Sequence, residues 1–222
     1  MIKQLLNVSR NLSAKLSVLL MLLAMLCASC SENEGEEEEY PDWKNTNEAY
    51  FKSLASSARQ AMAQGDKSWK AFLTYTKVEG AKAETTDSIF VHVVKEGTGA
   101  GSPAYTDSVK VHYRGRLIPS KSYPTGYVFD KTFEGDVFDP SVSNAAKFVV
   151  NSVVTGFATA LMHMHIGDHW IVYMPYKLGY DITEKSGIPI YSTLIFEMQL
   201  VSYFRAGTPT SAKTDFEWNG GE

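Results

Sequence analysis

The chain has only two cysteines, Cys27 and Cys30, and both lie within its first thirty residues. The rest of the chain therefore cannot form disulfides, and a hydrophobic core has to hold its fold together. An excess of basic charge is missing as well. When the six glutamates of residues 32–39 and the three basic residues of 1–15 are set aside, the 25 acidic and 21 basic residues fall to 19 and 18. Because no basic stripe is present, we expect no nucleic-acid partner.

The N-terminal segment has no apolar run of membrane-spanning length. Its apolar stretch, 16–26, has eleven residues, whereas a helix needs about 20 apolar residues to cross a bilayer. Three basic residues precede this stretch, and the small pair Ala28-Ser29 follows it. This order is typical of a secretory signal peptide, which predicts that residues 1–29 are removed from the mature protein.

The run Cys27-Ala28-Ser29-Cys30 resembles a bacterial lipobox, in which the last Cys is lipidated and becomes the first mature residue. It departs from that pattern at Cys27, where Leu is usual. The resemblance implies a lipid on Cys30 that anchors the chain in the cell envelope as an outer-membrane lipoprotein, either periplasmic or surface-exposed. The alternative is a secreted protein with a spare thiol. Residues 30–44 then form an acidic tether, which we expect to be disordered because like charges repel one another.

Residues 45–86 are predicted to form an N-terminal helical segment. The run Asn45-Thr46-Asn47-Glu48 is similar to a capping box. Apolar residues then recur at helical spacing up to Gly65, namely Tyr50, Phe51, Leu54, Ala58, Ala61 and Met62. We interpret this as one amphipathic helix, followed by a short second element in 69–75.

From Ser88 the apolar residues alternate with polar ones, which is typical of strands. In 109–114, the alternation turns Val109, Val111 and Tyr113 inward and the residues between them outward. Further strands are expected near 129, 148–150, 169–174 and 193–203, and one short helix in 154–163. The glycine-rich run 97–101 lies between two strands and lacks a following Lys-Ser/Thr, so it is predicted to be a turn and not a phosphate loop. The prediction is an α+β fold, with an antiparallel sheet wrapped around one short helix.

Five segments in the second half of the chain occur in one consistent order. They are VKVHYRG (109–115), GYVFD (126–130), VVTGF (153–157), YKLGY (176–180) and GIPIYSTLIFEMQLV (187–201). Together they resemble the FKBP-type peptidyl-prolyl cis-trans isomerases, over a domain expected to span 87–204, with a flexible tail at 205–222. In bacterial members a helical segment ahead of the domain can serve dimerisation. Homodimerisation through the N-terminal helix and packing of that helix on its own domain therefore both stay open.

The resemblance implies an enzyme that isomerises Xaa-Pro segments and assists the folding of exported proteins, with no cofactor and no metal. Macrolide-type inhibitors would be ligands. The alternative is a non-catalytic binding module of the same fold, or a chaperone for Pro-containing segments. Residues carried over as catalytic are Tyr113, Asp130 and Tyr180. Tyr180 would donate its hydroxyl to a substrate carbonyl, and Asp130 would be a partly buried carboxylate that accepts from the Tyr113 hydroxyl.

The resemblance also implies the walls of a proline pocket: Phe129, Val153, Val154, Phe157, Ile188 and Phe196. For each aromatic among these, core packing is the competing interpretation. The chain departs from the family pattern at Phe157, where Trp is usual, at Ala146, where an aromatic is common, and at Asp181, where Gly is usual. The segment between Asp130 and 148 is also long and has no Arg to pair with that carboxylate. Smaller aromatics at the position of Phe157 are tolerated in active members of the family. Ala146 and Asp181 favour the binding module, whereas Tyr113, Asp130, Tyr180, Ile188 and Phe196 favour the enzyme.

Two ambiguities remain in the sequence. Phe138-Asp139 repeats the Phe-Asp pair, and we prefer Phe129-Asp130 because Gly126 precedes it by the usual spacing. The histidines 163, 165 and 169 invite a metal interpretation, but they are expected at a helix end, in a turn and at a strand start. Since no Cys or carboxylate cluster accompanies them, no metal site is predicted.

Overall fold

The computed structural model describes residues 38–78, 80, 82–135 and 143–207, and the structural statements below concern these residues. The predicted signal peptide, the lipidation site Cys30, the Phe138-Asp139 pair and most of the predicted C-terminal tail lie outside them. The compact unit begins at Glu39. No helix in the described ranges is both long and apolar enough to cross a membrane.

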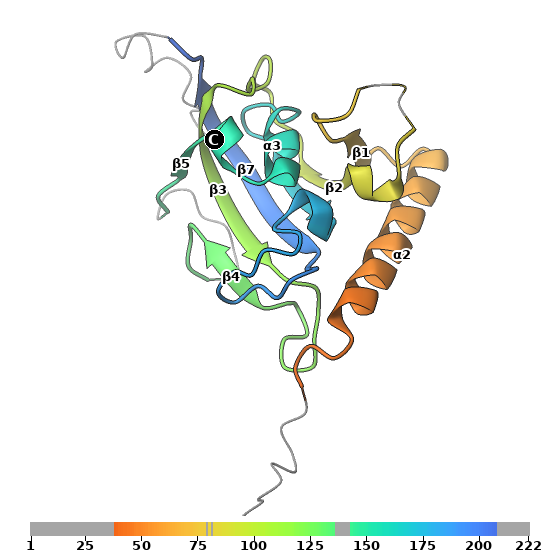
Figure 1. The fold of residues 1–222 in the computed structure, drawn as a ribbon. Helices are drawn as coiled ribbons and strands as arrows, with labels where there is room; N and C mark the ends of the chain where they lie inside the picture. Colours follow the sequence, from red (N-terminus) through yellow and green to blue (C-terminus); the bar gives the residue numbers. More distant parts are fainter. Residues whose placement is uncertain (1–37, 79, 81, 136–142, 208–222) are drawn as a thin grey trace, which may run out of the picture. The chain divides into compact units, whose positions relative to one another are not determined.

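Seven strands of the described chain form one antiparallel sheet in the order β1-β2-β6-β7-β3-β4, and β5 pairs with β3 beside this path (Figure 1). Their bounds are β1 Trp69–Leu73, β2 Ser88–Lys95, β3 Ser108–Arg116, β4 Val128–Lys131, β5 Ala146–Val149, β6 His169–Met174 and β7 Leu194–Phe204. The alternating segments of the sequence are therefore strands. The short second element expected in 69–75 is β1, the edge strand next to β2.

The helix α3 (Thr155–Leu161) packs on one face of this sheet. Its residues 156–161 are all buried, so the helix is surrounded by protein and forms the centre of the core. A short 3-10 turn precedes it in the chain at Val150–Ser152, and another follows β6 at Tyr176–Leu178. The predicted α+β fold, a sheet around one short helix, is confirmed.

The long helix α2 (Trp43–Ala63) covers the opposite face of the sheet near β2 (Figure 1). Phe51, Ala55 and Ala58 are buried against Phe90, and the rings of Phe51 and Phe90 meet edge to face with centroids 5.7 Å apart. Successive side chains of a strand point to opposite faces, so the neighbours of Phe90 in β2 point toward α3. The helix therefore packs on its own domain, the second of the two roles that the sequence leaves open.

The predicted capping box at Asn45 is wrong, because α2 begins two residues earlier, at Trp43. Its N-cap residue, Asp42, has a left-handed backbone (φ 46°) and makes no side-chain cap. The Asn45 side chain instead donates to Asp42 Oδ1 at 2.7 Å. Tertiary contacts fix this helix start in place of a local cap.

Those contacts tie the helix start to the loop before β7. Asn47 is fully buried, its Oδ1 accepts from the Thr193 backbone N–H at 2.7 Å, and its Nδ2 donates to the Trp43 carbonyl at 2.7 Å. The indole N–H of Trp43 donates to Ser192 Oγ at 2.8 Å. A buried polar side chain with both ends satisfied stabilises one arrangement of helix and loop.

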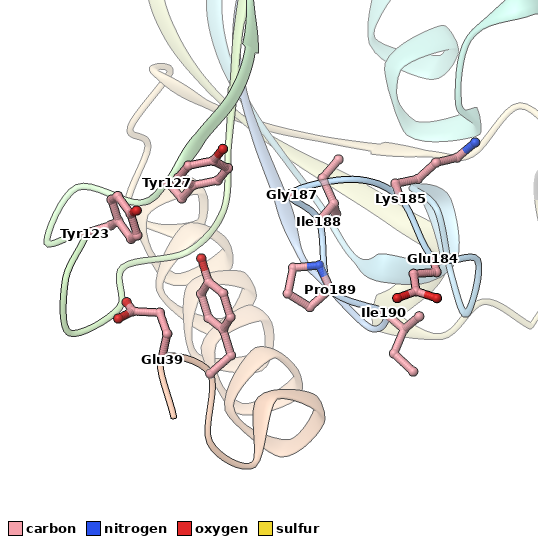
Figure 2. Close-up of a pocket in the computed structure, with 10 residues that line it drawn as sticks. Glu39, Tyr123, Tyr127, Glu184, Lys185, Gly187, Ile188, Pro189 and Ile190 are labelled. Atoms are coloured by element: carbon pink, nitrogen blue, oxygen red, sulfur yellow. The ribbon is translucent and has the colours of Figure 1, made fainter. Parts of the chain in front are cut away.

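The segment before α2 contacts a second loop. The Glu39 carboxylate accepts from the Ser120 hydroxyl at 2.6 Å and from the Ser122 backbone N–H at 3.0 Å. Loops 118–127 and 184–190 face each other across a hollow of about 710 Å³, lined by tyrosines on one side and by Ile188 and Pro189 on the other (Figure 2).

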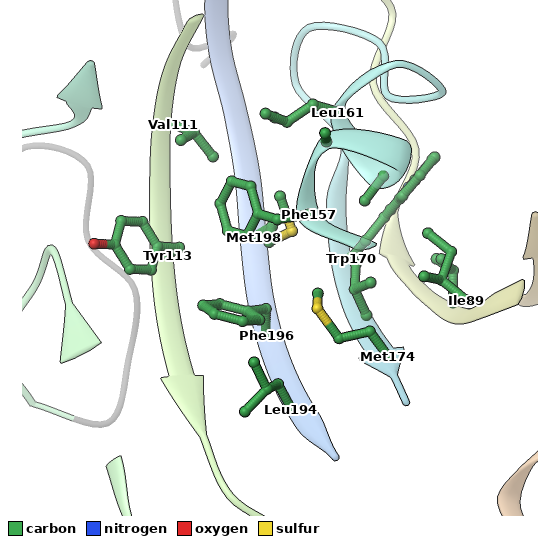
Figure 3. Packing of buried hydrophobic residues seen from close by; sticks show 14 of the residues in the cluster. Ile89, Val111, Tyr113, Phe157, Leu161, Trp170, Met174, Leu194, Phe196 and Met198 are labelled. Carbon is green, nitrogen blue, oxygen red and sulfur yellow. The ribbon is translucent and has the colours of Figure 1, made fainter. Parts of the chain in front are cut away.

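The main core lies between the sheet and α3, and Figure 3 shows its packing. Trp170 and Met198 from the two central strands are fully buried in it, as is Leu161 of α3. His112 alternates with Val111 and Tyr113 as expected, yet it is not exposed to solvent, since only 4% of it is accessible. The segment after β4 covers it, since Thr132 Oγ1 lies 3.5 Å from His112 Nδ1.

Candidate functional site

Five aromatic rings from five different elements meet at one end of the core, and we call them the aromatic cluster. They are Tyr113 of β3, Phe129 of β4, Phe148 of β5, Phe157 of α3 and Phe196 of β7 (Figure 3 labels three of them). The centroids are 5.1 Å apart for Phe157 and Phe196, 5.5 Å for Phe129 and Phe196, 5.7 Å for Tyr113 and Phe157, and 5.8 Å for Tyr113 and Phe148. Most of these pairs are edge to face, the arrangement that aromatic quadrupoles favour.

Tyr113 occupies a break in the pairing of β3. The first half of β3 pairs with β5, its last three residues pair with β4, and Tyr113 lies between the two partners. Its backbone N–H is satisfied by Thr132 Oγ1 at 3.0 Å, and its C=O accepts from the Thr132 N–H at 2.9 Å. Because two strands share this edge, Phe148 of β5 reaches the Tyr113 ring and Phe129 of β4 reaches Phe196, which itself packs on Tyr113.

The polar group of the aromatic cluster is the Tyr113 hydroxyl, which donates a hydrogen bond to Asp130 Oδ2 at 2.6 Å. Burial first, and then this hydrogen bond, raises the pKa of Tyr113 well above its usual range. Burial, followed by the negative charge of Asp130, also raises the pKa of Tyr180. Both phenols therefore stay protonated at neutral pH and can act as hydrogen-bond donors.

The prediction that Asp130 is partly buried is wrong, because this residue is exposed. β4 is a four-residue strand at the edge of the sheet, and only Phe129 in it is even partly buried. The Tyr113 hydroxyl thus reaches outward from the core to meet a carboxylate at the surface.

The loop that carries Tyr180 has an unusual backbone one residue later. Asp181 has φ 54°, in the left-handed region, and its N–H bonds to the Tyr176 carbonyl at 2.9 Å. This conformation explains why Gly is usual at the position, and Asp is one of the few other residues that adopt it readily. The Tyr180 ring packs on the core, and the Lys185 ammonium lies 5.4 Å from its centroid.

The remaining predicted wall residues belong to the same core as the aromatic cluster or pack against it. Ile188 is 6% exposed and belongs to the main core, while Val153 and Val154 are half-buried against it just before α3. Ala146 pairs with Val111 and is half-buried, so the aromatic missing at this position leaves less ring surface beside Tyr113.

The three histidines that invited a metal interpretation are engaged elsewhere. The ring of His163 stacks on Phe72 with centroids 4.2 Å apart, and His169 Nε2 lies 2.9 Å from Glu197 Oε1. His165 Nδ1 is 3.5 Å from Asp168 Oδ2. Among the residues that the structure describes, no three His, Cys, Asp or Glu side chains are grouped to hold a metal ion.

Comparison with known sequences identifies the family. Residues 99–201 match the family described as FKBP-type peptidyl-prolyl cis-trans isomerase, a span that includes every residue of the aromatic cluster. Residues 99–201 belong to the FKBP family. We refer below to this part of the chain, with the strands upstream that complete its sheet, as the FKBP-type domain.

Two curated relatives each match more than half of this chain. The "FKBP-type 22 kDa peptidyl-prolyl cis-trans isomerase" of Escherichia coli is 37% identical over 128 residues, covering 56% of this chain and 54% of the relative. The "Outer membrane protein MIP" of Legionella longbeachae is 32% identical over 150 residues, covering 67% of this chain and 57% of the relative. The chain thus spans little more than half the length of these relatives.

Among solved structures, the crystal structure of FkpA from Escherichia coli matches with a TM-score of 0.50 and 23% identity. The match covers 85% of this chain and 72% of that one. At this identity the likeness concerns the fold alone.

Sequence reasoning missed two residues of the FKBP-type domain that shape the site. Phe148 was expected only as part of a short strand, yet its ring completes the aromatic cluster; its alternation with Ala146 was the available signal. Gly115 lies in the segment VKVHYRG, and nothing in its sequence neighbourhood indicates a role for it. A Cβ atom there would lie 2.5 Å from Cε2 of Phe129 and 2.6 Å from Cε1 of Phe196. A glycine inside a strand marks such a close approach.

Proposed function

We propose that this chain is a peptidyl-prolyl cis-trans isomerase that acts on Xaa-Pro segments of exported polypeptides in the cell envelope. The observation that carries the proposal is the aromatic cluster built around Tyr113, whose hydroxyl meets Asp130 with Tyr180 close by. The family of residues 99–201 and the name of the Escherichia coli relative support it.

The reaction needs neither a nucleophile nor a metal. Its barrier is rotation about an amide with partial double-bond character, about 18–20 kcal/mol. A site accelerates this rotation by binding the twisted amide better than either planar form. Each factor of ten in rate requires only about 1.4 kcal/mol of such preference, which shape, exclusion of water and one or two hydrogen bonds can supply.

In this proposal, the aromatic cluster with Val153, Val154 and Ile188 receives the proline ring. Tyr180 donates its hydroxyl to a substrate carbonyl. Asp130, oriented by the Tyr113 hydroxyl, presents a negative charge to the rotating amide from the rim of the pocket. Macrolide-type inhibitors would occupy the same apolar pocket.

Asp130→Asn tests these roles, because it keeps the shape and removes the charge. The full chain in mild detergent is assayed on short Xaa-Pro peptides. We expect kcat/KM to fall about tenfold, equivalent to about 1.4 kcal/mol of lost transition-state stabilisation, while peptide or macrolide binding persists and stability changes by less than about 0.5 kcal/mol. Asp139→Asn is the matched control for the alternative Phe-Asp register. Loss of activity at Asp139 with none at Asp130 would overturn the assignment.

A second candidate function is a non-catalytic binding module or chaperone for Pro-containing segments. The exposure of Asp130 and the small side chain of Ala146 favour it, since a solvated charge acts weakly on a bound amide. An absence of turnover in wild type, together with binding of Pro-containing peptides, would select this candidate.

We further propose that the chain is a lipid-anchored outer-membrane lipoprotein with the fatty acid on Cys30. The proposal rests on the apolar stretch 16–26 and the lipobox-like run that follows it. The name of the Legionella longbeachae relative supports an envelope location. Cys30→Ser should abolish fatty-acid labelling and release the protein from the membrane fraction or leave it as an uncleaved precursor. Unchanged labelling would refute the site.

In the proposed organisation, a signal peptide at 1–29 precedes an acidic tether that ends where the compact unit begins, at Glu39, and not at 44 as predicted. The predicted helical segment 45–86 is corrected to the helix α2 from Trp43 to Ala63, followed by β1, which belongs to the sheet. The domain at 87–204, which β1 extends, and the tail at 205–222 stay proposals. A homodimer through α2 would have to use the outer face of the helix, because Phe51, Ala55 and Ala58 pack on the sheet of the same chain. Sedimentation of the full chain tests for the dimer.

A further inference from the structure

We propose that the hollow between loops 118–127 and 184–190 binds the residues that flank the proline in a client polypeptide, as one extended segment. This inference rests on the proposed isomerase function. It adds a second subsite to that function, with a preference for basic segments.

The hollow has the size and lining of a binding site. Its volume of about 710 Å³ lies within the range of about 300–1,000 Å³ typical of ligand pockets. Tyr40, Tyr123 and Tyr127 contribute aromatic surface, and Figure 2 shows the last two across from Ile188 and Pro189. Phenol rings combine apolar contact area with hydroxyls that both donate and accept, which suits the alternating apolar and peptide groups of an extended chain.

The hollow adjoins the proposed proline pocket at three points. Ile188 lines the hollow and is also a predicted wall of the pocket. Tyr127 lines the hollow and packs on the same core as Phe129, two residues further along. Lys185 also lines the hollow, and its ammonium lies 5.4 Å from the centroid of the Tyr180 ring. We infer that a polypeptide with its proline in the aromatic cluster places the residues next to that proline over Ile188 and into the hollow.

The walls of the hollow are held in place by contacts within the chain. The Glu39 carboxylate fixes loop 118–127 through Ser120 and Ser122. The ring of Tyr40 packs on Trp43 with centroids 4.5 Å apart, and the Trp43 indole is bonded to the loop before β7. Little ordering is then required on binding, which preserves affinity.

The charges around the hollow favour a basic segment. Glu39 and Glu184 line it, and hydrogen bonds from Ser120 and Ser122 lower the pKa of Glu39, so its carboxylate is ionised at neutral pH. The single lysine of the lining, Lys185, lies over the Tyr180 ring. Lys or Arg beside the proline should therefore bind better here than Asp or Glu.

The test compares two substrates with the full chain. One is a four-residue Xaa-Pro peptide, which reaches only the proline pocket. The other is a twelve-residue peptide that contains the same four residues with lysine-bearing flanks. We expect wild type to show kcat/KM at least fivefold higher on the long peptide. Tyr123→Ala should remove this advantage and leave the short peptide unchanged.

A matched control is available in Tyr105→Ala. Tyr105 is 41% exposed and Tyr123 is 40% exposed, and each pairs with another tyrosine at a centroid distance of 5.0 Å. Tyr105 does not line the hollow, so its removal should leave both substrates unaffected. A second variant, Glu184→Lys at an exposed position, should change the preference for lysine flanks into one for glutamate flanks. This variant tests the subsite independently if Tyr123→Ala fails to fold.

The outcomes separate the two proposals. No turnover of either peptide would refute the isomerase function, and the dissociation constant of the labelled long peptide would then test the hollow directly, with a severalfold loss of affinity expected in Tyr123→Ala. Equal kcat/KM for both peptides in wild type, or an undiminished advantage in Tyr123→Ala, would overturn the subsite. A loss on both peptides in Tyr123→Ala would place Tyr123 in the proline pocket itself and also overturn it.

Discussion

Replacing Gly115 by Ala should disturb the aromatic cluster more than any loss of a surface contact would. The added Cβ would lie 2.5 Å from Phe129 and 2.6 Å from Phe196, and real Cβ contacts are longer than 3.0 Å. The atom would enter from the backbone of β3 between two rings that now meet at 5.5 Å, so at least one ring has to move. Phe196 is 5% exposed and held against Phe157, whereas Phe129 lies half-buried on the edge strand β4. We expect Phe129 to yield.

Two opposing effects determine how much stability Gly115→Ala loses. Overpacking of a well-packed core costs about 1–3 kcal/mol. Ala in a strand is less costly than Gly by about 0.5–1 kcal/mol, because the unfolded chain loses less freedom. The steric effect is larger, since two rings are approached at once, and the net loss should be about 1–2 kcal/mol. For a domain of this size, that corresponds to a fall in Tm of about 2–8 °C.

Urea unfolding followed by tryptophan fluorescence measures the loss, and the isomerase assay should show lower activity because the proline pocket is displaced. Phe129→Leu in the Gly115→Ala background supplies the control, since a smaller side chain relieves the contact. The double variant should then lose less stability than the sum of the two single variants. Gly115→Ala with wild-type stability and activity would refute the close packing of these rings on β3.

Two further predictions concern the attachment of α2 and the outer face of the sheet. Asn47→Ala should lower the free energy of unfolding by about 1–3 kcal/mol, because it leaves the buried Thr193 N–H unsatisfied. The control Asn45→Ala, at an exposed position, should change it by less than about 0.5 kcal/mol. Equal effects of the two variants in urea unfolding would contradict the attachment of α2 to the loop before β7 through Asn47. Hydrogen bonding to His169, together with the charge of Arg114, lowers the pKa of Glu197 below its usual value of 4.5. The stabilisation that the ionised Glu197 gives the folded state is therefore fully present above about pH 4.5, and it is lost as the pH falls through the lower pKa of the folded state. Glu197→Gln should make the free energy of unfolding less dependent on pH in this acid range.

Much of the fold could be predicted from local patterns. The alternation in 88–95, 109–114 and 193–203 indicated strands, and the short apolar run near 155 indicated α3, because side-chain periodicity depends only on the geometry of each element. The resemblance also placed Tyr113 within reach of Asp130, and their hydrogen bond is present. The roles of these residues in catalysis stay predictions.

Other features depended on residues far apart in the chain. Phe129, Phe148 and Phe196 come together only because β4 and β5 share the edge of β3 that lies opposite β7, and the spacing of a single strand carries no trace of that pairing. The exposure of Asp130 follows from its place on an edge strand, which the sequence around it does not specify.

The start of α2 likewise depends partly on local sequence and partly on distant contacts. By itself, the sequence determined that a helix forms here, since helical periodicity is local, but it pointed to a cap at Asn45 that is not made. The tertiary structure decided where the helix begins and what it covers, through the bond from Trp43 to Ser192, 149 residues away. Local spacing specifies which faces are apolar, and only the folded chain brings distant partners within hydrogen-bonding distance of them.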